Sequence, residues 1–108
     1  MGRGYFGPKT VELMTVNHIR PKMFPLEIRG YERLGEGFGL GFGVNIDPPA
    51  SQNLGSDGSY GWGGLACTGF LIDPKEDLVL IQMAQFIPPP EQQLFKLLNT
   101  IVYQSLTD

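Results

Sequence analysis

The chain is poor in the residues from which most reactive protein sites are built. Its 108 residues include one cysteine and one histidine. A single cysteine excludes an intrachain disulfide and hence a secreted, disulfide-stapled scaffold, and it favours a reducing, cytoplasmic compartment. One histidine and one cysteine are too few for tetrahedral zinc ligation. We therefore expect no metal site and no cofactor.

Clustered positive charge and long apolar runs are also missing. The formal net charge is −3 and the pI is near 5.0, whereas phosphate backbones and anionic lipids attract clustered Lys and Arg. The longest apolar run, around Leu78–Ala84, is too short to span a bilayer. The start, Met1–Gly4, opens no apolar signal-peptide stretch. We expect neither nucleic acid nor membrane as a partner.

What the chain does contain suits one globular domain. Hydrophobic residues make up 42% of it and charged residues 18%, as in ordinary globular proteins. A chain of this length can build one core but not two. We predict a single domain over residues 1–108.

The first half of the chain predicts a helix, an arm, a strand and a loop. Apolar residues at helical spacing indicate a short helix within Lys9–His18. The stretch Arg20–Glu36 has prolines and no clear period, which is typical of a connecting arm. Glycine alternates with large apolar residues over Gly37–Val44, which predicts one strand. The polar stretch Ala50–Ser59 predicts an exposed loop.

The second half predicts a hairpin. The segments Tyr60–Ile72 and Leu78–Phe86 are rich in aromatic and branched residues, which favour strands. Between them, Asp73–Asp77 has the composition of a turn. Its three carboxylates could suggest a metal site, but acidic residues are common at turns that contain proline, so we interpret them as a solvated turn.

After Pro88–Pro90, which breaks the sheet, the segment Glu91–Leu106 predicts an amphipathic helix. One side holds Leu94, Leu97, Leu98, Ile101 and Val102, and the other holds Gln93, Lys96, Asn99 and Gln104.

Together these elements predict an α+β fold, an antiparallel sheet of at least three strands with an N-terminal helix and with the C-terminal helix packed on one face. The strand Leu78–Phe86 is apolar on both faces, and one helix covers only one of them. Four uncovered apolar side chains would forgo roughly 1.5–3 kcal/mol each. The chain therefore needs a partner, either a second copy or a missing portion of the protein.

We interpret the single histidine, the single cysteine and the alternating glycines as structural rather than catalytic features. We expect His18 to interact with the last carbonyls of the first helix and Cys67 to pack in mid-strand rather than act as a nucleophile. The alternating glycines of Gly37–Val44 lack the spacing and the lysine of a phosphate loop, so we expect another element to approach them closely.

The segment Tyr60–Leu65 is harder to explain by packing, because three glycines within four residues weaken a strand. On an edge strand, such glycines would leave main-chain groups open to a ligand. Trp62 would form a flat wall beside them, and Tyr60 could line the same groove.

Several motifs, taken in order, resemble the C-terminal region of the β-lactamase-like serine hydrolase superfamily, which includes class C β-lactamases, family VIII esterases and penicillin-binding-protein-like enzymes. Nearly the whole chain takes part in this likeness. The matching segments are Pro8–Thr15, Phe38–Val44, Gly61–Gly64, Phe70–Leu78 and Met83–Gln85.

The resemblance implies a partial β-lactamase or transpeptidase-like fold and a role for Trp62, Gly63 and Gly64 as the strand box beside the substrate. It also implies that the backbone N–H of Leu65 is one of two oxyanion-hole donors, the other coming from the nucleophilic serine. A fixed donor of this kind stabilises the oxyanion, and its loss typically costs roughly 2.7–4 kcal/mol.

The family's Ser-x-x-Lys and Tyr-x-Asn motifs are absent from this chain, so no catalytic set is complete. We predict the C-terminal portion of a carboxylesterase or β-lactamase type hydrolase, inactive alone, with a partner at the edge of Leu78–Phe86. Two alternatives stay open, namely a small binding or assembly module that reuses the sheet and a truncated product without selected function.

Overall fold

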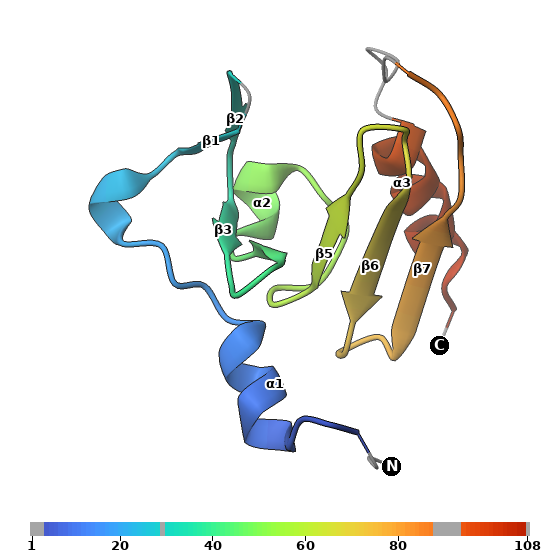
Figure 1. Ribbon diagram of the computed structural model, residues 1–108. Coiled ribbons are helices and arrows are strands. Elements are labelled where there is room, and N and C mark those ends of the chain that lie inside the picture. The colour runs from blue at the N-terminus through green and yellow to red at the C-terminus, as the bar shows by residue number, and fades with distance from the viewer. Residues whose placement is uncertain (1–3, 29, 88–93, 108) are drawn as a thin grey trace.

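The computed structural model describes residues 4–28, 30–87 and 94–107. These residues form an α+β fold with an N-terminal helix, antiparallel sheets and a C-terminal helix (Figure 1), which confirms the predicted class. The elements are α1 (Pro8–Met14), η1 (Pro21–Met23), β1 (Leu26–Ile28), β2 (Tyr31–Arg33), β3 (Glu36–Phe38), β4 (Gly43–Asn45), α2 (Pro48–Ser51), β5 (Tyr60–Gly63), β6 (Gly69–Asp73), β7 (Leu78–Gln82) and α3 (Leu94–Ser105).

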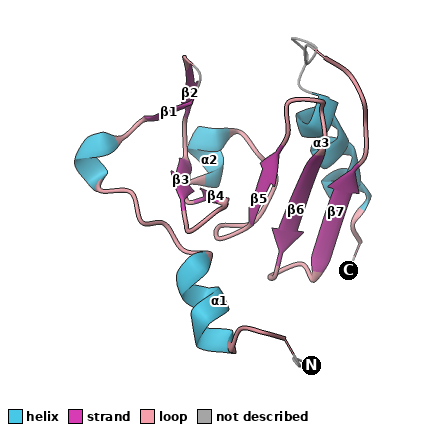
Figure 2. Cartoon of the chain, in the orientation of Figure 1, coloured by secondary structure: helices cyan, strands magenta, loops and turns pink. Residues whose placement is uncertain are grey.

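The main sheet has five strands in the order β3-β4-β5-β6-β7, and every neighbouring pair is antiparallel. Each strand follows its neighbour in the chain, so short turns suffice to connect most of them. The strands β1 and β2 form a separate two-stranded hairpin (Figure 2). The predicted sheet of at least three antiparallel strands is confirmed.

The prediction of one strand over Gly37–Val44 is wrong. The segment is the hairpin β3–β4, in which the N–H of Gly39 donates to the carbonyl of Phe42 at 2.8 Å. Gly41, at φ 107°, takes a backbone conformation that favours glycine. Alternating glycines suit a strand and a tight turn equally well, so the period of two did not reveal the reversal.

The segment Tyr60–Ile72 is likewise two strands, β5 and β6, joined by a turn. In this turn the N–H of Gly64 donates to the carbonyl of Thr68 at 2.9 Å. Cys67 therefore lies in a turn at φ 70° and not in mid-strand as predicted. Its Sγ donates to the carbonyl of Phe86 at 3.4 Å.

Two segments predicted to be irregular contain short regular elements. The arm Arg20–Glu36 holds η1 and the β1–β2 hairpin. The loop expected at Ala50–Ser59 overlaps the end of α2. The Oδ1 of Asp47 caps this helix by accepting from the N–H of Ala50 at 3.4 Å, a role that Asp favours at helix starts.

The predicted hairpin of β6 and β7 around Asp73–Asp77 is confirmed. The solvated-turn interpretation holds for residues 74–77, which are exposed, but not for Asp73, which is fully buried. Its carboxylate accepts from the Tyr103 hydroxyl at 2.7 Å and from the N–H groups of Ser56 and Lys75 at 3.0 and 3.1 Å. A buried carboxylate needs such partners.

The helix α3 packs on one face of the sheet, as predicted (Figure 1). The ring of Phe95 lies over Gly69, and Tyr103 reaches Asp73. Asn99, predicted on the polar side, is buried, whereas three residues of the predicted apolar side are 47–57% exposed, namely Leu94, Leu97 and Ile101. The helix is therefore rotated from the predicted orientation. Pro88–Pro90 and the predicted start at Glu91 lie outside the described residues.

The end of α1 and the segment that follows it meet the β3–β4 hairpin at closely packed glycines. A side chain at Gly37 would meet Asn17, and one at Gly39 would meet the carbonyl of Met14, so the predicted close approach is confirmed. His18 lies beyond the end of α1, and its Nε2 is 2.8 Å from the carbonyl of Leu13. This confirms the predicted contact with the last helix carbonyls.

Within the described part of the chain, the buried hydrophobic residues are Val44 and Leu71. On β7, the side chains of Val79 and Ile81 are 62% and 63% exposed, and no described strand pairs with the outer side of β7. The fold therefore leaves much apolar surface uncovered.

Among the described residues, no helix has both the length and the apolar character of a membrane-spanning segment.

Candidate functional site

The strand β5 is paired fully on one side and partly on the other. All four of its residues pair with β6, but only Tyr60 and Gly61 pair with β4. The predicted edge-strand position is therefore wrong for the first half of β5. Trp62 and Gly63 extend past the ladder of β4, and that side of their backbone is paired with no described strand.

The turn after β5 presents an unpaired backbone amide. Gly64 and Cys67 close the turn, because the N–H of Cys67 donates to the carbonyl of Gly64 at 3.2 Å. Leu65, at the tip, has a side chain 52% exposed, and its N–H donates to none of the described residues. The amide singled out by the resemblance therefore has no hydrogen-bond partner among the described residues.

Trp62 is half-buried and held from two sides. Its indole packs edge-to-face on Phe38, with ring centroids 5.1 Å apart. The guanidinium of Arg33 lies 5.7 Å from the ring centroid, within the range of a cation–π interaction. The indole is therefore a fixed wall and not a sealed core residue.

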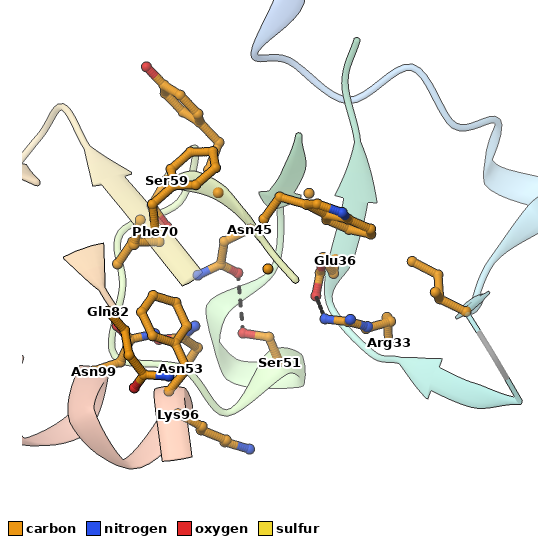
Figure 3. Close-up of a pocket in the computed structure, with 18 of the residues that line it drawn as sticks. Arg33, Glu36, Asn45, Ser51, Asn53, Ser59, Phe70, Gln82, Lys96 and Asn99 are labelled. Atoms are coloured by element: carbon orange, nitrogen blue, oxygen red, sulfur yellow. Dashed lines mark hydrogen bonds and ion pairs between the residues drawn. The ribbon is translucent and has the colours of Figure 1, made fainter. Parts of the chain in front are cut away.

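A cavity of about 630 Å³ runs from β2 and β5 to the helices α2 and α3. Figure 3 shows Arg33 and Glu36 on one side of Asn45 and Ser51, with Gln82, Asn99 and Lys96 on the other. Its volume is in the range of small-molecule pockets. All the residues singled out from the sequence except Leu65 line it, namely Tyr60, Trp62, Gly63 and Gly64.

Hydrogen bonds fix the polar wall at the middle of the cavity. Asn45 is buried. Its amide donates to the carbonyl of Gly55 at 3.2 Å and accepts from the hydroxyl of Ser51 at 3.2 Å. The hydroxyl of Ser59 and the Oδ1 of Asn99, both buried, have no partner among the described residues.

Glu36 is the one carboxylate that lines the cavity and shows a clear pKa shift. Burial raises the pKa of Glu36 above its usual value, and the Arg33 guanidinium, 3.4 Å from its Oε2, opposes this only in part. Desolvation disfavours the charged form of a carboxyl group. The net effect is a pKa above the usual value, in spite of the nearby Arg33 guanidinium.

Close packing accounts for two of the glycines that we interpreted as open backbone. A side chain at Gly61 would meet the carbonyl of Phe70, and one at Gly64 would meet the hydroxyl of Thr68. Gly61 faces backbone that cannot move aside, so this position requires glycine inside the β5–β6 hairpin, whereas at Gly64 the Thr68 side chain would have to rotate. The unpaired backbone amide therefore belongs to Leu65, and the glycines of this segment did not by themselves indicate it.

No catalytic set forms around Leu65 in the described ranges. The hydroxyl of Ser51 lies within hydrogen-bond distance of both the Asn45 amide oxygen and the carbonyl of Pro48, and that of Ser105 donates to the carbonyl of Val102. Ser59 is buried. His18 bonds to the end of α1. No cluster of three metal-ligating side chains occurs among the described residues.

Sequence reasoning missed most residues of the cavity, among them Arg33, Glu36 and Asn99. Arg33 and Glu36 belonged to the predicted arm, and the turn between β2 and β3 places Arg33 by the ring of Trp62 and Glu36 beside the Arg33 guanidinium. Asn99 was assigned to the solvent side of α3. The ring of Phe95 packs closely on Gly69, which sets the rotation of α3 about its axis. In the sequence, Gly69 was the only residue that could have indicated this close contact between helix and sheet.

Comparison with known protein families finds no match. Two curated proteins of Mycobacterium tuberculosis are similar to this chain. They are "Uncharacterized protein MT1414" of strain CDC 1551 / Oshkosh and "Protein Rv1367c" of strain H37Rv, each 32% identical over 85 residues. The match covers 75% of this chain and 21% of each relative. The chain thus spans about a fifth of the length of these relatives.

Proposed function

We propose that this chain is the C-terminal portion of a β-lactamase-like serine hydrolase, of carboxylesterase or β-lactamase type. In this proposal, the serine nucleophile and its base belong to another portion of the protein. The β5 strand contributes Trp62 as a wall of the substrate cleft and the N–H of Leu65 as an oxyanion donor. The chain alone does not turn over substrate.

The observation that supports this role is the free N–H of Leu65. It follows a strand whose outer side is unpaired at Trp62 and Gly63, and the preceding residue, Gly64, lines the cavity, although Leu65 itself does not. A backbone donor fixed by a turn stabilises developing negative charge without reorganising. Such a donor is of little use without a nucleophile, so the proposal needs a second portion.

The uncovered apolar surface supports the need for that portion. A self-sufficient domain of this size buries most of the surface that its unfolded chain exposes. Here the described residues bury two hydrophobic side chains, while Leu94, Leu97 and Ile101 on α3 are half exposed. The mycobacterial relatives are several times longer than the match, so in them such a portion has room to exist.

The sharpest test is the DNA immediately upstream of the codon for Met1. We expect an in-frame Ser-x-x-Lys motif there. An open frame without it, or a stop codon with no separate gene product that restores activity, would contradict the proposal. The purified 108-residue chain should leave a p-nitrophenyl ester and nitrocefin unhydrolysed above the buffer rate.

The role of Leu65 can be tested in the longer protein with a matched pair of variants. Leu65→Pro removes the N–H, whereas Leu65→Ala removes the side chain and keeps it. Loss of one oxyanion donor typically lowers kcat about 10²–10³-fold, so we expect this loss for Leu65→Pro and near-normal kcat for Leu65→Ala. Equal losses in both variants would assign Leu65 a packing role.

A second candidate function is a small binding module that reuses the sheet, with Tyr60 and Trp62 lining the groove. The cavity of about 630 Å³ with aromatic and amide walls favours this candidate. Saturable binding of a small molecule by the chain alone, with no Ser-x-x-Lys motif upstream, would support the module over the hydrolase portion.

A further inference from the structure

The turn after β5 is fastened to the end of β7 and to the segment that follows it. The carbonyl of Cys67 accepts from the side-chain amide of Gln82 at 2.6 Å. The carbonyl of Ala66 accepts from the N–H of Phe86 at 3.1 Å. The carbonyl of Phe86 accepts in turn from the Cys67 Sγ at 3.4 Å. The second half of the turn is therefore held from outside the β5–β6 hairpin.

These contacts orient the N–H of Leu65 through a single peptide group. The carbonyl of Gly64 and the N–H of Leu65 belong to the same planar trans peptide, so they point in opposite directions. The Gly64 carbonyl points into the turn, because it accepts from the N–H of Cys67 at 3.2 Å. The Leu65 N–H therefore points out of the turn, and its direction depends on where Cys67 is held.

Cys67 has a backbone conformation that needs such support. Its φ of 70° lies in the left-handed region, which is unfavourable for a residue with a Cβ. Such a conformation persists where the surrounding structure enforces it. The thiol of Cys67 is a weak donor, so the hydrogen bond from Gln82 is the stronger of its two side-chain contacts. Gln82 is buried, and its backbone pairs with Gly69 of β6, so the sheet fixes the base of this side chain.

We infer that Gln82 is the positioning residue of the Leu65 N–H. The amide of Gln82 holds the carbonyl of Cys67, and the N–H of Cys67 holds the carbonyl of Gly64. The peptide between Gly64 and Leu65 then presents its N–H outward. Gln82 acts through the turn and not on the reacting atoms. The consequence for catalysis rests on the proposed function, in which this N–H is an oxyanion donor.

Amide hydrogen exchange of the 108-residue chain tests the positioning without any activity. Gln82→Met keeps a side chain of similar length and removes the donor. We expect the N–H of Cys67 to exchange about tenfold faster in this variant, because its bond to Gly64 opens more often once the Cys67 carbonyl is released. Gln104→Met, at an exposed glutamine of α3, is the matched control and should exchange as the wild type does.

Two results of this exchange experiment would overturn the inference. One is equal exchange at Cys67 in the wild type and in Gln82→Met. The other is an equal acceleration across the N–H groups of β6, which would show that Gln82 stabilises the whole sheet and not the turn in particular.

Kinetics of the longer protein test the consequence for catalysis. Misplacement of a group by about 1 Å can cost on the order of 10²-fold in rate, so we expect kcat to fall about 10- to 100-fold in Gln82→Met with KM nearly unchanged. In a Leu65→Pro background, which already lacks the N–H, the same substitution should barely change kcat, since residues that act through one group are not additive. A full additional loss in that background would overturn the inference.

The two experiments separate this inference from the proposed function. A longer protein that hydrolyses neither esters nor β-lactams would defeat the proposed function, and the exchange at Cys67 would still decide whether Gln82 positions the turn. A longer protein that hydrolyses its substrate with the same kcat in the wild type and in Gln82→Met would defeat the inference and leave the proposed function standing.

Discussion

The hydroxyl of Tyr103 on α3 donates to the Oδ2 of Asp73 at the end of β6, at 2.7 Å. The carboxylate is fully buried, and the pKa of Tyr103 is raised by burial and by this hydrogen bond. The contact fastens the last turns of α3 to the sheet. Few other polar contacts connect this helix to the rest of the described chain.

Removing this hydroxyl should measurably destabilise the fold. Tyr103→Phe keeps the ring and leaves a buried carboxylate short of one donor, so we expect a loss of about 1.5–3 kcal/mol in the free energy of unfolding. Tyr31→Phe, at an exposed ring, is the control and should change it by less than about 0.5 kcal/mol. Urea denaturation followed by circular dichroism measures both. If both variants lost equally little unfolding free energy, the Tyr103–Asp73 hydrogen bond would not stabilise the fold.

The same carboxylate should make stability fall in acid. Burial raises the pKa of Asp73, but the hydrogen bonds from Tyr103, Ser56 and Glu76 outweigh it, and the pKa is lower than the ordinary 3.8. A folded pKa below the unfolded one gives stability that is present above the unfolded pKa and is lost as the pH falls through the folded pKa. We expect thermal stability to decline below about pH 3.8.

Asp73→Asn should be less stable than the wild type at neutral pH and should lack much of that acid-induced decline. Asp57→Asn, which removes an exposed carboxylate, changes the net charge equally and should keep the wild-type profile. Parallel profiles for the wild type and Asp73→Asn would contradict the assignment of the acid sensitivity to Asp73.

Glu36 should show the opposite dependence. Its pKa is raised above 4.5 by burial, in spite of Arg33, so its favourable contribution is full below pH 4.5 and is lost as the pH rises through the folded pKa. We expect Glu36→Gln to gain stability relative to the wild type between pH 4.5 and 7. The gain should vanish in more acidic buffer. A loss of stability at pH 7 would show that the Arg33 interaction outweighs the burial.

A side chain at Gly39 should loosen the contact between α1 and the β3–β4 hairpin. The added carbon of Gly39→Ala would meet the backbone carbonyl of Met14, which cannot move as a flexible side chain could. Overpacking of this kind costs about 1–3 kcal/mol. Gly4→Ala, at an exposed glycine, should cost far less. Thermal unfolding of the two variants distinguishes a steric effect from a general effect of removing glycine.

The segments that the sequence predicted well are those with two independent signals. The β6–β7 hairpin has branched residues on both sides of a Pro-containing turn, and α3 has a helical apolar period. The reversals at residues 39–42 and 64–68 were missed because glycine is compatible with both strand and turn. Cys67 takes a positive φ, and a cysteine side chain does not predict a turn.

The site was predictable only in part, for a related reason. The residues Tyr60–Gly64 are contiguous, so a local pattern could identify them. Arg33 on β2 and Glu36 on β3 come from a segment without periodicity, and only Arg33 lies by the ring of Trp62. Asn99 is buried by the rotation of α3 about its own axis. Such placements depend on tertiary packing, which no local pattern encodes.

The seven-residue helix α1 buries none of its side chains. A helix of this length is unstable in isolation. Backbone hydrogen bonds from the end of α1 and the following segment to the β3–β4 hairpin hold it in place. The N–H of Leu40 donates to the carbonyl of Met14 at 2.9 Å, and the N–H of His18 donates to the carbonyl of Phe38 at 2.8 Å. Trypsin cleavage after Lys9 would accordingly release a peptide and leave the sheet intact.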